Sequence, residues 1–213
     1  MHREALLLLT FATAGCALTS KGEAVQPRFY SAEVAAPART GGAGATGSCD
    51  LRLGGVDAAA HLRERMVFRQ PSGEVGFYEE RRWTERPEVY ARRALSRALF
   101  EQKGLREVVA GEAPTLSVEL LAFEEVRRDD GSAVRLRLAA ELSDDRTVVW
   151  RQTFAAEKAL PGKSDDERAG AIAAALAQCL QEVAAAVAES TVKELPKVAG
   201  TAGGTAACAV AER

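Results

Sequence analysis

Alternating apolar side chains mark three consecutive stretches in the middle of this chain of 213 residues. The apolar positions are Leu116, Val118, Leu120 and Ala122, then Val134, Leu136, Leu138, Ala140 and Leu142, then Val148, Trp150 and Phe154. A period of two is that of a strand with one buried face. The acidic segments 129–131 and 144–146 between the stretches are typical of turns. The pattern predicts an antiparallel meander with one face exposed to water.

Two amphipathic helices accompany these strands. A helix is expected over residues 84–102, with Pro87 in its first turn and Gly104 as its stop. A longer, alanine-rich helix begins at a capping box, Ser164 to Glu167, and runs to about Lys193. Its apolar seam comprises Ile172, Leu176, Cys179, Leu180, Val183 and Val187.

The segments before the first helix predict further strands. Leu51 and Leu53 alternate in a strand over 49–56, and Pro71, Ser72 and Gly73 form the turn of a hairpin. The predicted fold class is therefore α+β: a single domain with a largely antiparallel sheet and two helices packed on one face.

The first sixteen residues resemble a lipoprotein export signal. A short apolar run follows Arg3, and at ten residues it is too short to span a bilayer, which takes roughly 20. It ends in Thr13-Ala14-Gly15-Cys16, which resembles a bacterial lipobox with cleavage between Gly15 and Cys16 and a diacylglycerol thioether on Cys16. The alternative is an ordinary signal peptide with an incidental cysteine. Ala17 is not aspartate, which by the same resemblance favours the outer membrane.

The chain then divides by composition into four segments. Residues 1–15 are expected to be a signal peptide, and 16–48 a lipidated tether with a short strand at 28–34 and a Gly-rich loop. Residues 49–194 form the α+β domain, and 195–213 a disordered tail.

Few residues are candidates for chemistry. The net charge of −2 implies no nucleic-acid partner, and His61 is the only histidine after the signal segment. No metal site is predicted, and we expect no enzymatic activity. The acidic pairs, including Glu124-Glu125, are interpreted as turns and caps. Cys49 and Cys179 are a candidate disulfide if the first strand lies beneath the last helix; alternatively, Cys179 is a buried thiol.

The segment 51–101 resembles the ABC-type transport auxiliary lipoprotein family, which includes the lipoprotein of the paraquat-inducible intermembrane transport system. The resemblance depends on a strand, a leucine-bearing turn, an aromatic hairpin, Arg-Trp, a proline and an amphipathic helix. These are 51–56, Leu62, Val67-Phe68-Arg69, Phe77-Tyr78, Arg82-Trp83, Pro87 and 90–100. The Gly-rich insert at 35–48 and the tail after Pro196 depart from the family pattern.

The resemblance implies an outer-membrane-anchored, non-catalytic docking adaptor of an ABC or MCE-type system that moves lipids or other hydrophobic molecules across the Gram-negative envelope. It implies a periplasmic MCE-type partner, a membrane contact through the lipid anchor, and a homo-oligomer as a further hypothesis. No cofactor is expected beyond the covalent diacylglycerol and acyl chain, such as palmitate, at Cys16. A periplasmic carrier of lipids or small ligands, and a hydrolase with an unrecognised carboxylate site, remain as alternatives.

Three aromatic residues of the predicted hairpin are candidates for an interface: Trp83, Tyr78 and Phe77. If the hairpin exposes alternate faces, some of them face solvent and contact a partner. Trp83, just before the helix, is the foremost candidate. The alternative places these rings in the core beneath the helix.

Overall fold

A computed structural model describes residues 26–33, 49–144, 146–162 and 164–199 of the chain. The predicted signal segment, the lipidation and cleavage sites at Gly15 and Cys16, the Gly-rich loop and the tail beyond residue 199 lie outside these ranges. The expectations for them therefore remain predictions.

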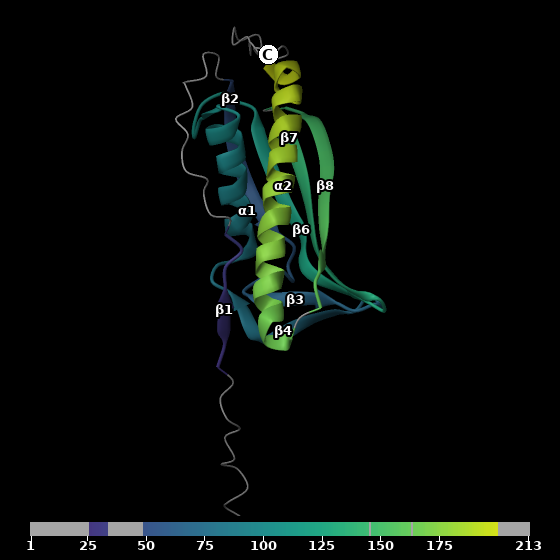
Figure 1. The fold of residues 1–213 in the computed structure, drawn as a ribbon. Helices are drawn as coiled ribbons and strands as arrows, with labels where there is room; N and C mark the ends of the chain where they lie inside the picture. Colours follow the sequence, from purple (N-terminus) through teal and green to yellow (C-terminus); the bar gives the residue numbers. More distant parts are fainter. Residues whose placement is uncertain (1–25, 34–48, 145, 163, 200–213) are drawn as a thin grey trace, which may run out of the picture.

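The described residues form the predicted α+β domain (Figure 1). In chain order its elements are β1 (Arg28–Tyr30), β2 (Asp50–Ala58), β3 (Arg65–Arg69), β4 (Val75–Trp83), α1 (Pro87–Ser96), the π-helix η1 (Arg97–Gln102), β5 (Arg106–Glu107), β6 (Thr115–Arg128), β7 (Gly131–Ser143), β8 (Val148–Leu160) and α2 (Asp165–Ala199). The hairpin and the three-stranded meander are confirmed, because β3–β4, β6–β7 and β7–β8 are antiparallel.

Strand β6 is the centre of the sheet. One edge of β6 pairs along its whole length with β7. The other edge is shared by two parallel neighbours: β2 pairs with the first half, and β3 pairs with residues 124–126. Strand β5 extends the β2 branch, while β4 and then β1 extend the β3 branch. The sheet is therefore mixed, and a parallel pairing places β1 beside the hairpin strand β4.

Both helices cover the same face of the sheet (Figure 1). The predicted seam of α2 is buried against the strands, and Leu51 and Leu53 of β2 lie in the same core. The helix is long and apolar enough to cross a membrane by length and composition, but 56% of that stretch is buried within the domain. Packing on the sheet accounts for its apolar character.

Both helices differ in detail from the sequence expectation. The first is α-helical only to Ser96 and continues as the π-helix η1, which ends before Gly104 at φ +69°. The second runs past Lys193 to Ala199, because Leu195 and Val198 are both buried and Pro196 lies in its last turn. Ser164 donates a hydrogen bond to the Glu167 carboxylate at 3.1 Å.

A glycine and an aromatic ring are packed together in the hairpin. Gly73 in the turn has φ +88°, a value that favours glycine. Gly76 is paired with Phe68 across the ladder, and a Cβ at Gly76 would lie 2.2 Å from the Phe68 ring. The ring therefore occupies the space that a side chain at position 76 would fill.

Candidate functional site

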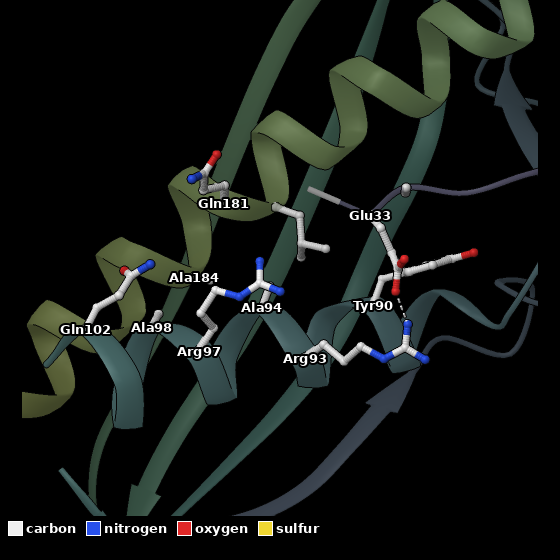
Figure 2. Close-up of a pocket in the computed structure, with 11 residues that line it drawn as sticks. Glu33, Tyr90, Arg93, Ala94, Arg97, Ala98, Gln102, Gln181 and Ala184 are labelled. Carbon is white, nitrogen blue, oxygen red and sulfur yellow. Dashed lines mark hydrogen bonds and ion pairs between the residues drawn. The ribbon is translucent and has the colours of Figure 1, made fainter. Parts of the chain in front are cut away.

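A shallow groove lies between α1, η1 and α2 (Figure 2). Its floor is made of the small side chains of Ala94, Ala98 and Ala184. Ala32 and Glu33, which follow β1, close one end of the groove. Arg93 at this end forms salt bridges with Glu33 and Glu85, so its charge is compensated. The cavity volume is only about 40 Å³, too little for an acyl chain or a drug-sized ligand.

A larger, open cleft lies on the hairpin. We call it the arginine cleft; its lining is Ala60, His61, Arg63, Glu64, Arg65, Phe77 and Arg82, and its volume is about 330 Å³. Phe77 is 40% exposed there. The charged lining distinguishes this cleft from the apolar pockets that usually bind small hydrophobic ligands.

Glu124 of β6 is fully buried among two arginines. Arg69 of β3 donates to both carboxylate oxygens, at 3.0 and 3.1 Å, and Arg135 of β7 donates at 2.5 and 3.2 Å. Burial by itself would raise the pKa of Glu124, but the arginine hydrogen bonds outweigh it and hold the pKa below its ordinary value. Glu124 is therefore an anion that joins three strands.

Glu125, the next residue, has a separate set of partners. Arg168 of α2 donates to it at 2.7 Å, Arg127 at 3.2 Å, and the Tyr78 hydroxyl at 2.5 Å. Burial would raise the pKa of Glu125, but the bonds from Tyr78 and Arg168 bring it below its ordinary value. The pKa of Tyr78 is raised, mainly by burial and also by its bond to the carboxylate. The cluster connects the hairpin to the start of α2.

The interpretation of Glu124-Glu125 as a turn or cap was wrong. Both residues lie within β6, where adjacent side chains point to opposite faces of the sheet. Glu125 faces α2, whereas Glu124 faces the side that the helices leave open. Two carboxylates on opposite faces cannot converge on one substrate, so this pair does not form the acid–base site that a glycosidase needs.

The three aromatic interface candidates have different surroundings. Trp83 is 1% exposed and packs edge-on against Tyr90 and Phe123, so its nomination as the foremost interface residue was wrong. It is buried because its side of β4 lies beneath the helices. Tyr78 is half-buried and engaged with Glu125. Phe77 is exposed in the arginine cleft and remains available for contact.

The predicted Cys49–Cys179 disulfide is not formed. Cys179 is a free, buried thiol, while Cys49 is disulfide-bonded. The two residues lie near different edge strands: the Cys49 carbonyl accepts a hydrogen bond from the Arg106 N–H of β5, whereas Cys179, on α2, lies beside Lys158 of β8. Burial raises the pKa of the Cys179 thiol to about 11. The alternative from the sequence, a buried thiol in the apolar seam, is confirmed.

Within the part of the chain that the structure describes, no group of three or more His, Cys, Asp or Glu side chains could hold a metal ion. The buried carboxylates there are surrounded by arginines. Sequence patterns could not reveal these clusters, because an arginine on a strand looks like any outward-facing polar residue.

Comparison with known proteins identifies the fold and the family. A DUF330-family protein from Xanthomonas campestris has a crystal structure with a TM-score of 0.65 and 20% identity, covering 82% of this chain and 100% of that one. A crystal structure of an uncharacterized protein gives a TM-score of 0.60 at 16% identity, covering 78% and 98%. No curated protein matches.

The family comparison is the more informative one. The model of the ABC-type transport auxiliary lipoprotein component matches residues 30–188, which span β1 through most of α2. This description concerns a transport component, which suggests a non-enzymatic role, and a lipoprotein, which suggests a membrane-anchored location in the envelope. The chain belongs to the ABC-type transport auxiliary lipoprotein family.

Proposed function

We propose that this protein is the outer-membrane-anchored lipoprotein subunit of an ABC or MCE-type system that moves lipids or other hydrophobic molecules across the Gram-negative envelope. It acts as a non-catalytic docking adaptor: acyl chains on Cys16 hold one end at the membrane, and the folded domain binds a periplasmic MCE-type subunit. The family match carries this proposal.

The packing of the described domain supports an adaptor over a carrier. A carrier of lipids needs an apolar cavity of about 300 Å³ or more. The groove between the helices holds about 40 Å³, and the larger cleft is lined by arginines. The helix–sheet interface is filled by a continuous cluster of buried apolar residues.

The adaptor is tested by purification from detergent-solubilised envelopes. We expect a periplasmic MCE-type subunit to co-purify with the wild-type chain. Photo-crosslinking groups at exposed Gln181 beside the groove, and at exposed Arg137 on the opposite face of the sheet, would show which face the subunit contacts. Recovery of no transporter subunit would contradict the adaptor.

The anchor is tested by Cys16→Ala. Each buried CH₂ contributes about 0.8 kcal/mol, so several acyl chains give stable attachment and their loss should release the protein. We expect the variant in the soluble periplasmic fraction and the wild type in membranes. An unmodified thiol at Cys16 in the mass spectrum of the native protein would exclude the anchor.

The choice of membrane is tested by Ala17→Asp. By resemblance to bacterial lipoproteins, aspartate after the lipidated cysteine favours retention at the inner membrane. We expect Ala17→Asp to move to the inner-membrane fraction of a density gradient, and the control Ala17→Ser to stay with the outer membrane. Equal distribution of the two variants would contradict outer-membrane sorting by this residue.

A further inference from the structure

Three residues from three strands form a row across the hairpin. Arg65 of β3 is paired with Arg82 of β4, and Arg82 is in register with Phe29 of β1. Paired residues project from the same face of a sheet. Trp83, the next residue on β4, is buried beneath the helices, so the row lies on the face that they leave open.

The charge of this row is not compensated by the surrounding protein. Glu64, the acidic residue of the arginine cleft, forms its salt bridge with Arg86 outside the cleft lining. Arg63 donates to the carbonyl of Ala60 at 3.2 Å. Within the described ranges, neither Arg65 nor Arg82 has a carboxylate partner. Like charges directly opposite each other destabilise a sheet, so the fold keeps this pair at a cost.

The cleft also has the shape and polarity of a site for an amphipathic anion. Its volume of about 330 Å³ is open to solvent, and Arg63, Arg65 and Arg82 line it together with Phe77. The Nε2 atom of His61, in the same lining, is buried without a hydrogen-bond partner. Phe77 is 40% exposed and Phe29 is 60% exposed. Guanidinium groups suit phosphate oxygens, while the rings offer apolar surface beside them.

The position in the chain brings this cleft near a membrane. Thirteen chain steps separate Cys16 from Phe29, and even fully extended they span at most about 45 Å. A lipid on Cys16 therefore confines the cleft to the neighbourhood of the membrane surface.

We propose that the arginine cleft binds the phosphate of anionic phospholipid headgroups, so that β1 and the β3–β4 hairpin form a second, reversible contact with the membrane. This inference rests on the proposed anchoring at Cys16. The rings of Phe29 and Phe77 lie at the interface, and Arg63, Arg65 and Arg82 face the headgroup phosphates. The contact orients the domain, whereas the acyl chains hold it.

The test measures headgroup binding without anchor or partner. The full chain carrying Cys16→Ala is sedimented with vesicles of phosphatidylcholine alone or of phosphatidylcholine mixed with phosphatidylglycerol. We expect binding to the mixed vesicles only. Arg65→Gln/Arg82→Gln should weaken this binding roughly 30-fold, since each arginine near an anionic surface contributes roughly five-fold in affinity and the two contributions multiply.

A matched control separates the cleft from general charge. Arg137→Gln/Arg146→Gln removes two exposed arginines elsewhere, neither of which forms a salt bridge among the described residues. We expect this variant to bind almost as the parent does. Equal losses in both double variants would overturn the proposal, and so would unchanged binding of the cleft variant.

Two further readouts identify the source of the anion and exclude a folding defect. The melting temperature of Arg65→Gln/Arg82→Gln should not fall, because the substitution relieves repulsion between the two arginines.

Stabilisation by inorganic phosphate without vesicle binding would overturn the membrane contact. Loss of the transporter subunit in pull-downs of the cleft variant, with vesicle binding intact, would assign the cleft to a protein partner instead. The vesicle assay uses a chain without the lipid, so it does not depend on lipidation of Cys16. A finding that native Cys16 carries no lipid would therefore refute the anchor and leave the headgroup contact to be judged by the vesicle assay.

Discussion

Glu124 and Glu125 are buried carboxylates whose pKa values would be raised by burial but are held low by their hydrogen-bonded partners, most of them arginines. Both are fully buried, and each is surrounded by arginines that are only partly exposed. Removing one partner from such a cluster is costly, because the remaining charges stay desolvated. The carboxylates therefore contribute to stability only while they are ionised.

Acid should destabilise the protein through these two groups. Their folded-state pKa values lie below the unfolded value of about 4.3. Their contribution is thus fully present above that value and is lost as the pH falls through the lower folded-state pKa. We expect the urea midpoint to fall as the pH is lowered below the unfolded-state pKa of about 4.3.

The substitution Glu124→Gln assigns this pH dependence. We expect it to lower the free energy of unfolding at pH 7 by about 2 kcal/mol and to flatten the acid limb. Glu141→Gln is the control, because Glu141 forms a more exposed salt bridge with Arg151. It should cost less than about 1 kcal/mol. An unchanged acid limb in Glu124→Gln would contradict the assignment.

At the scale of single elements, the β3–β4 hairpin depends on the contact between Gly76 and Phe68. The Phe68 ring also lies against the Arg127 guanidinium, 3.8 Å from the ring centroid, and edge-on to Tyr78. The ring is held on three sides and cannot move aside at low cost. The glycine is therefore required by space and not by its backbone angles.

Gly76→Ala should lower the free energy of unfolding by about 1–3 kcal/mol through overpacking. Gly170 of α2 is the matched control, because a Cβ there meets nothing within 4 Å. Gly170→Ala should instead stabilise the helix by about 0.5–1 kcal/mol. Denaturation with urea measures both. If Gly76→Ala were equally harmful in a Phe68→Ala background, the ring would not be the cause.

Elements with local signals were predictable from the sequence. The turn at 71–73 and the seam of α2 follow from residue spacing, and both are confirmed. The π-helical end of the first helix has no such signal. The last turn of α2 was missed because Pro196 suggests a stop, although Leu195 and Val198 gain burial if the helix continues.

At the scale of the whole molecule, the sheet has a protected centre and exposed margins. Strand β6 is paired on both edges, whereas the three-residue β1 pairs with β4. The parallel joins of β2 and β3 to β6 connect residues more than fifty positions apart. Sequence patterns could not predict these joins, because nothing local selects a distant parallel neighbour.

Hydrogen exchange should reflect this arrangement. We expect amides of β6 and β7 to exchange slowest and those of β1 fastest, because opening the centre requires global unfolding. Exchange followed by mass spectrometry, peptide by peptide, measures the difference. Protection of β1 equal to that of β6 would contradict this expectation and show that β1 opens only when the whole domain unfolds.

The opposite orientations of Glu124 and Glu125 also help to select the correct register of β6 in the sheet. A slip of β6 by one residue would exchange the two faces and bring one of the two glutamates to the position of the other. The second glutamate would then be a buried anion without its arginine partners. The native alignment is therefore distinguished from its nearest competitors by charge as well as by the fit of apolar side chains.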